Sequence, residues 1–82
     1  MAHFHFVYIL TSVSNPERQY TGLTSKLTAQ LTAHNRGRVR PTAGDRPWRI
    51  ETAVAFTSRE KAETFRNHLR TESGRAVAEL LL

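Results

Sequence analysis

The hydrophobic pattern near the N-terminus is that of a β-strand. In HFHFVYILTS, residues 3–12, polar and apolar positions alternate at first and then become continuously apolar. Successive side chains of a strand point to opposite faces. One face would then carry Phe4, Phe6, Tyr8 and Leu10, and the other His5, Val7 and Ile9. Apolar residues on both faces indicate a strand that is covered on both sides, at least in its second half.

The next segments predict a hairpin followed by a helix. Asn15-Pro16 is typical of a turn, and residues 18–22 can pair back on the first strand. A helix should begin near Thr24 or Ser25, either of which could cap it, and its hydrophobic positions recur at helical spacing. Gly37 is suited to end this helix in the left-handed conformation.

The second half of the chain predicts a basic loop, a third strand and two helices. Residues 38–48 are rich in arginine and contain two prolines, which is typical of a loop. The alternation in residues 48–56 predicts a strand. Thr57 or Ser58 should cap a helix with a hydrophobic stripe of Ala62, Phe65 and Leu69. Residues 72–74 should break that helix ahead of a short last helix over residues 75–82.

This order of elements predicts the fold class. Strand, strand, helix, strand, helix, helix is most simply an α+β fold, with a three-stranded antiparallel sheet flanked by helices. A chain of 82 residues is expected to form one domain, residues 1–82.

Composition changes this picture mainly through charge. Twelve Lys and Arg residues against seven Asp and Glu give a net charge of +5, and ten of the twelve cations are arginines. Arginine is suited to bidentate contact with phosphates or carboxylates. A nucleic acid or another polyanion is therefore the expected partner, although the same charge would also keep a small protein soluble.

Other features disfavour several classes of protein. The chain has no cysteine, which excludes disulfides and Cys-based zinc sites and is compatible with a reducing cytosol. The first apolar run is too short for a signal peptide and has no Lys or Arg ahead of it. No segment approaches the roughly 18 apolar residues of a membrane span. We expect a cytoplasmic protein that does not contact membranes.

Two tyrosines are the first candidates for chemistry. Tyr8 and Tyr20 lie on the two strands of the predicted hairpin, within cross-strand reach of each other. Both should lie near Gly22 and the start of the first helix. Such a pair could simply stabilise a small sheet, so a site requires further groups that point to the same place.

The order and spacing of several short motifs supply those groups. They are Phe6-Val7-Tyr8, Tyr20-Thr21-Gly22, the helical run from Leu27 through His34-Asn35 to Gly37, Arg46-Pro47-Trp48, Ala62-x2-Phe65 and Ser73-Gly74-Arg75-Ala76. Together they resemble the GIY-YIG endonuclease superfamily. The resemblance is strongest to small stand-alone bacterial members related to the N-terminal domain of excinuclease C, and it spans roughly residues 6–77. It implies the same α+β fold and metal-assisted hydrolysis of a phosphodiester.

The resemblance also implies roles for four catalytic candidates. Tyr8 would help to deprotonate the attacking water, and Tyr20 would line the same site. Gly22 would let the backbone turn close to the substrate, which a Cβ would obstruct. His34 matches a helix histidine that could bond phosphate or shuttle a proton, or could simply be a packing residue.

Two positions depart from the family pattern. Gln30 stands where the family has an arginine that neutralises charge on the phosphate, and an amide brings no positive charge. Arg66 stands where the family has a glutamate that binds a divalent metal, and arginine cannot ligate Mg²⁺. We therefore expect impaired hydrolysis and no bound metal, with Mg²⁺ or Mn²⁺ as cofactor only if the site is active. Glu63 is one turn away, but the stripe points it toward the flank of the helix.

The leading hypothesis is a degenerate GIY-YIG domain that binds DNA or RNA, as a monomer or a weak homodimer. Its candidate contacts are Gln30, Arg36, Arg38, Arg40, Arg46 and Arg66. Tyr8 and Tyr20 could stack or donate hydrogen bonds if both rings reach solvent in a pocket shared with positions 30 and 66.

Two alternatives remain open. One is an active DNA endonuclease, directed to branched structures or single strands, that uses a rearranged site. The other is a non-catalytic protein-interaction domain in which Leu80–Leu82 forms a patch that pairs with a copy of itself.

Overall fold

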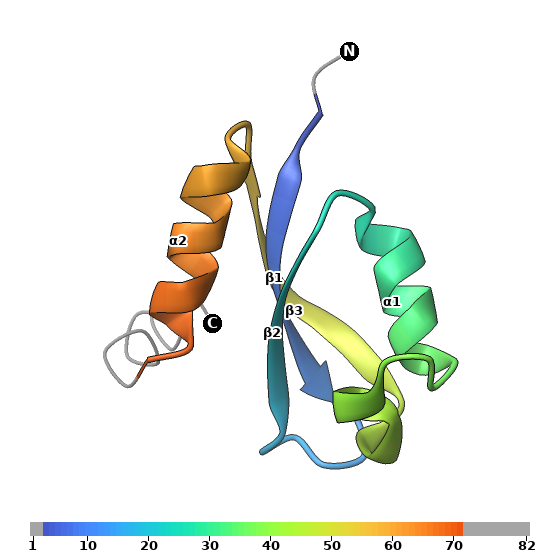
Figure 1. Ribbon diagram of the computed structural model, residues 1–82. Coiled ribbons are helices and arrows are strands. Elements are labelled where there is room, and N and C mark those ends of the chain that lie inside the picture. The colour runs from blue at the N-terminus through green and yellow to red at the C-terminus, as the bar shows by residue number, and fades with distance from the viewer. Residues whose placement is uncertain (1–2, 72–82) are drawn as a thin grey trace.

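The computed structural model describes residues 3–71, which form three strands and two α-helices (Figure 1). In chain order the elements are β1 (His5–Ser12), β2 (Gln19–Thr24), α1 (Leu27–Asn35), the short 3₁₀ helix η1 (Arg40–Asp45), β3 (Trp48–Phe56) and α2 (Arg59–Leu69). The predicted α+β class is confirmed. The expected break at 72–74, the last helix at 75–82 and the Leu80–Leu82 patch lie outside the described residues.

The strand order places β1 in the centre of the sheet. The order is β2-β1-β3, and both neighbours run antiparallel to β1. Tyr8 pairs with Gly22 on one side and with Ala53 on the other. Because a helix covers each face of the sheet, the central strand buries side chains on both of its faces. This explains the continuous apolar run of the segment.

The two helices cover opposite faces of the sheet (Figure 1). On the α2 face the core consists of Val7, Ile9, Ala62 and Leu69, with Leu23, Phe56 and Phe65 packed against it. On the α1 face it consists of Tyr8, Leu10 and Trp48, with Tyr20, Leu27, Leu31 and Ile50 packed against it. Alternate residues of β1 therefore enter different cores, as the period-2 pattern predicted. Within residues 3–71, no helix has the length and hydrophobicity needed to cross a bilayer.

The predicted ends of two elements need correction. β2 does not end at Gly22 but continues to Thr24, which pairs with Phe6. The prediction that Thr24 or Ser25 caps α1 is therefore wrong: α1 begins at Leu27 without a side-chain cap, and the Thr24 hydroxyl accepts from the Lys26 amide at 3.0 Å. The predicted cap of α2 is confirmed, because the Ser58 side chain accepts from the Lys61 amide at 3.2 Å.

The basic loop is more ordered than its composition suggested. Six of its residues form η1, and Gly37 precedes it in the predicted left-handed conformation, with φ of 73°. The Asn35 side chain bridges α1 to β3, donating to the Trp48 carbonyl at 3.0 Å and accepting from the Trp48 amide at 2.6 Å. The indole of Trp48 also donates to the Thr42 carbonyl at 2.8 Å. These bonds hold the segment against the end of α1.

Gly22 supports the aromatic core by having no side chain. A Cβ at this position would overlap Cζ and the hydroxyl of Tyr8. The φ of Gly22 lies outside the left-handed region, so the close approach of the phenol, and not a turn, requires glycine. Gly44 in η1 provides a contrast, because a Cβ there would meet nothing within 4 Å.

We expect Gly22→Ala to lower the free energy of unfolding by about 1–3 kcal/mol, because the buried phenol has no room to retreat. Gly44→Ala, the matched control, should change it by less than about 0.5 kcal/mol. Urea unfolding measures both. In a Tyr8→Leu background, which lacks the overlapping atoms, the cost of Gly22→Ala should shrink. Strictly additive costs in the double variant would contradict this contact.

Candidate functional site

Tyr8 lies at the centre of the site, on the middle strand and on the face that α1 covers. Its side chain is buried, with 2% of its surface exposed. The hydroxyl lies 2.9 Å from Nε2 of His34. The expectation that both tyrosine rings reach solvent is therefore wrong for Tyr8. The reason is that α1 and the glycine-bearing strand β2 together enclose a ring that projects from the central strand.

His34 is the second buried member of the site. It lies in the last turn of α1 and is 0% exposed. Nε2 faces Tyr8, and Nδ1 lies 2.7 Å from the hydroxyl of Thr42, which is also fully buried. Helical spacing from Leu27 and Leu31 places this histidine on the buried face. Both of its ring nitrogens are hydrogen-bonded inside the core.

Tyr20 is the member of the site that remains half-buried. It pairs with Leu10 on β1 and is therefore a diagonal neighbour of Tyr8. Its ring centroid lies 5.0 Å from that of His34 and 6.4 Å from that of Tyr8. We call these three rings, Tyr8, Tyr20 and His34, the aromatic cluster. Tyr20 is the ring of this cluster with most access to a ligand.

Burial controls the protonation of the cluster. Desolvation, and then the neighbouring Tyr20, raise the pKa of Tyr8 to about 12, while the Gln30 side chain and the Arg70 guanidinium act in the opposite direction. Desolvation lowers the pKa of His34 below its ordinary value of 6.5. At neutral pH both the phenol and the imidazole are therefore neutral. A neutral phenol with so high a pKa is a poor general base.

Two side chains outside the aromatic cluster act on the Tyr8 phenol. Gln30, which is half-buried on α1, lowers the pKa of Tyr8 by hydrogen bonding, and the positive charge of Arg70 lowers it electrostatically. Arg70 follows the last residue of α2, and its Nη2 donates to the Thr21 carbonyl on β2 at 2.9 Å. Sequence reasoning did not single out Arg70. Its position one helical turn after Arg66 was the available signal, because residues four apart share a helix face.

The expectation that position 66 shares a pocket with Tyr8 and Tyr20 is wrong, because Arg66 is not part of the aromatic cluster. It lies on α2, which packs on the opposite face of the sheet from Tyr8, and it is half-buried. Its Nε donates to the Asn67 side chain at 3.2 Å. The structure thus brings Tyr8, Tyr20, Gly22, Gln30 and His34 together, whereas Arg66 shares with Arg70 the side of α2 near β2.

The remaining predicted contacts surround η1 and the end of α1. All four arginines are exposed; they are Arg36, Arg38, Arg40 and Arg46. Arg46 donates to the Ala43 carbonyl at 2.8 Å, and the nearby carboxylate of Asp45 pairs with Arg18 at 3.3 Å. In Figure 1 this basic segment lies beside α1, on the other side of the sheet from α2.

The aromatic cluster contains no carboxylate that could hold a divalent metal. Position 66, where the family resemblance implies a metal ligand, lies on α2 across the sheet and carries a guanidinium, which cannot coordinate a cation. Glu63, the nearest acid on the same helix, pairs with Arg59 at 3.0 Å. Among residues 3–71, no three His, Cys, Asp or Glu side chains are grouped so that they could hold a metal ion.

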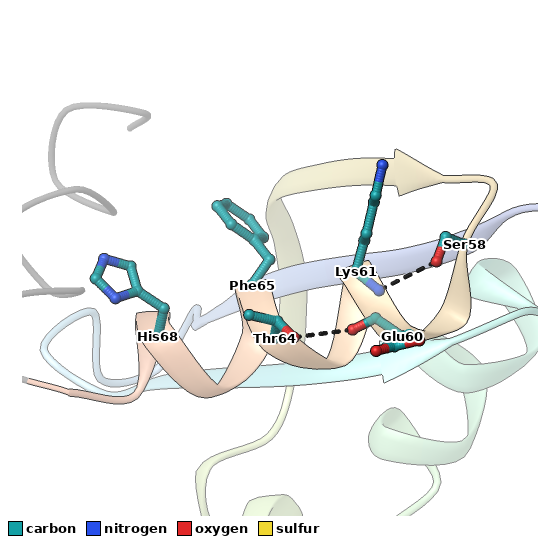
Figure 2. A pocket seen from close by; sticks show the side chains of 6 residues that line it. All are labelled: Ser58, Glu60, Lys61, Thr64, Phe65 and His68. Atoms are coloured by element: carbon teal, nitrogen blue, oxygen red, sulfur yellow. Dashed lines mark hydrogen bonds between the residues drawn. The ribbon is translucent and has the colours of Figure 1, made fainter.

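A separate hollow of about 540 Å³ lies along α2 (Figure 2). Six side chains line it: Ser58, Glu60, Lys61, Thr64, Phe65 and His68. All of them come from α2 and its cap, so the hollow contains no member of the aromatic cluster. It does not bring convergent polar groups from different elements together, as a catalytic site requires.

This fold and cluster define a class of protein. The antiparallel sheet places a tyrosine of the central strand over the glycine of an edge strand, beside a second tyrosine and a helix histidine. A model of the GIY-YIG catalytic domain matches residues 4–76. The chain therefore belongs to the GIY-YIG family, a family of nucleases that act on nucleic acids and generally depend on divalent metals.

A solved structure narrows the comparison. The chain is similar to the UPF0213 protein BH0048 from Bacillus halodurans, whose solution structure was determined by NMR. The two are 29% identical with a TM-score of 0.57, over 95% of this chain and 82% of the other. A search of curated proteins found no match.

The lowered pKa of His34 predicts acid sensitivity. The unfolded chain binds a proton near pH 6.5, whereas the folded chain binds it only at lower pH. The stabilisation is therefore complete above about pH 6.5 and is lost as the pH falls through the folded pKa. Between the two values the free energy of unfolding should drop by at most about 1.4 kcal/mol per pH unit.

Urea unfolding between pH 7.5 and 4.5 measures this slope, and NMR titration of the imidazole measures the pKa directly. His34→Gln should flatten the slope, whereas His68→Gln, which changes an exposed histidine, should leave it intact. A His34 resonance that titrates at or above pH 6.5 would show that the ring is not held neutral by burial.

Proposed function

We propose that this chain is a GIY-YIG domain that binds DNA or RNA and whose phosphodiester hydrolysis is impaired. The observation that carries the proposal is the state of the aromatic cluster. Its architecture is that of a nuclease site, but the Tyr8 hydroxyl is buried against a neutral imidazole. The groups that should supply charge at positions 30 and 66 are an amide and a cation.

The missing charges have opposite consequences for catalysis and for binding. Loss of one preorganised electrostatic group typically costs about 10²–10³ in rate, and Gln30 brings no positive charge to the phosphate. Arg66 repels a divalent metal, yet it adds a positive group beside Arg70 at the edge of β2. The edge therefore favours a phosphate as a ligand while it lacks the means to cut one.

The basic segment around η1 provides the second part of the proposed interface. The four arginines of this segment are exposed, so they can contact successive phosphates. Bonds from Asn35 and Trp48 hold the backbone that carries them. Arginine binds phosphate oxygens in a bidentate manner. Tyr20, half-buried at the edge of the cluster, is placed to stack on an unpaired base.

Binding should be weak and strongly dependent on salt, because phosphate contacts dominate it. We expect a Kd in the low-micromolar range or weaker at physiological salt, as for other non-specific complexes, whose Kd values are about 10⁻⁴–10⁻⁶ M. Fluorescence anisotropy with labelled single- and double-stranded oligonucleotides, over a series of salt concentrations, measures both quantities. Absence of binding at low salt would argue for the protein-interaction alternative.

A matched pair of variants separates a defined interface from general charge. Arg38→Ala with Arg40→Ala removes two arginines of the basic segment and should lower the salt slope by about 1–2. Arg49→Ala with Arg59→Ala removes the same charge, but these arginines pair with Glu51 and Glu63, so the slope should change little. Equal losses in both variants would show that the segment around η1 is not a specific contact.

Restoring the family residues tests the catalytic part of the proposal. We expect Gln30→Arg combined with Arg66→Glu to produce metal-dependent nicking of DNA, or to raise it sharply, since both missing charges return. Plasmid nicking with Mg²⁺ or Mn²⁺, with EDTA as a blank, measures it. Adding Tyr8→Phe to the same background should abolish the gain.

Two results would overturn this assignment. If the double variant folds, as judged by circular dichroism, and remains inactive, positions 30 and 66 do not hold the missing functions. If instead the unaltered chain cuts branched, single-stranded or duplex DNA, and both EDTA and Tyr8→Phe abolish the cutting, the chain is an active endonuclease. This second function would require Nε2 of His34 to accept the Tyr8 proton despite the burial of both groups.

A further inference from the structure

We propose that Thr42 is a positioning residue, which fixes the proton of His34 on Nδ1 and so directs the lone pair of Nε2 toward the Tyr8 hydroxyl. The proposal goes beyond nucleic-acid binding, because it concerns the arrangement of protons inside the aromatic cluster. It holds whether or not the chain binds a polyanion.

The number of protons available to Thr42 decides the direction of its bonds. Its hydroxyl oxygen lies 3.2 Å from the Val39 carbonyl and 2.7 Å from Nδ1 of His34. A carbonyl can only accept, and a hydroxyl has one proton to donate. When Thr42 donates to Val39, it must accept from His34. Nδ1 then carries the imidazole proton.

This tautomer determines what His34 offers to Tyr8. In a neutral imidazole with a proton on Nδ1, Nε2 is an acceptor. The Tyr8 hydroxyl, 2.9 Å away, must then be the donor. The chain of bonds runs from Tyr8 through His34 and Thr42 to the Val39 carbonyl; Tyr8, His34 and Thr42 each donate once, and the carbonyl only accepts. If the phenol releases its proton, Nε2 is the atom that receives it, and the products are a phenolate and an imidazolium.

The opposite tautomer is less well satisfied. With the proton on Nε2, His34 would donate to Tyr8, and Nδ1 would take the Thr42 proton away from Val39. The phenol proton would then have to go to the Gln30 side chain, which also interacts with this hydroxyl, because Tyr8, His34 and Thr42 are exposed by 2%, 0% and 0% and water does not offer an acceptor freely. The bond from the Thr42 hydroxyl to the Val39 carbonyl would be lost as well. The first arrangement keeps that bond and needs no further acceptor, which favours it.

Thr42 is held firmly enough to impose this choice. Its amide donates to the Val39 carbonyl at 3.1 Å, and its own carbonyl accepts from the Trp48 indole at 2.8 Å. The threonine therefore orients the histidine without touching the reacting atoms, as outer-shell partners orient metal-bound histidines.

Long-range ¹H–¹⁵N NMR of the ¹⁵N-labelled full chain tests the proposal, because the two ring nitrogens resonate differently when protonated and unprotonated. We expect Nδ1 of His34 to show the shift of a protonated nitrogen and Nε2 that of an unprotonated one at pH 7.5. Thr42→Ser should keep this signature, since serine has the same hydroxyl. Thr42→Val should lower the ratio of the two tautomers by about tenfold or more.

The controls separate proton placement from packing. Thr32→Val removes a hydroxyl from the exposed side of α1, where it donates to the Thr28 carbonyl, and should leave the His34 spectrum unchanged. A proton on Nε2 in the unaltered chain would overturn the proposal. An unchanged spectrum in a folded Thr42→Val chain would do the same. If Thr42→Val fails to fold, the unaltered and Thr42→Ser spectra still decide the tautomer.

Discussion

A buried line of hydrogen bonds from Tyr8 through His34 to Thr42 is the constraint on which the rest of this structure depends. It connects the central strand, the first helix and η1, and the Trp48 indole extends it to the start of β3. A phenol, an imidazole and a hydroxyl are costly to bury alone. Each one is tolerated here because the next satisfies it. The same requirement explains Gly22, whose missing side chain leaves room for the phenol that begins the line.

The proposed function rests on the polar and charged side chains around this line of hydrogen bonds, and not on the line itself. Tyr8, Tyr20 and His34 meet on one face of the sheet in a chain of the GIY-YIG family. Gln30 adds an amide on the helix that covers this face, whereas Arg66 adds a guanidinium on the helix of the opposite face. Positive groups attract a phosphate but cannot hold a metal ion. In the proposed function, these two positions favour contact with a polyanion over its hydrolysis.

Much of the fold could be predicted because local patterns coincide with tertiary contacts. The alternation in residues 48–56 gave the bounds of β3, and Ser58 marked the start of α2. The start of α1 was placed too early, since pairing with Phe6 outweighs the capping preference of Thr24. In the site, the predicted hairpin placed Tyr8 within reach of Tyr20, and the family resemblance added His34. Thr42 carried no local signal, and Arg70 was marked only by its spacing of four residues from Arg66, because their partners are distant in sequence or lie on another element.

The sequence by itself determined the strands and helices, the two-sided central strand and the excess of positive charge, since these depend on periodicity and composition. Only the tertiary structure decided that Tyr8 is enclosed while Tyr20 stays half-open, that a loop threonine bonds to the imidazole, and that Arg66 lies across the sheet from the phenol. Those outcomes depend on how the helices pack on the two faces of a twisted sheet. This packing brings together side chains that are far apart in the sequence, and the local pattern of one segment does not determine its distance from another.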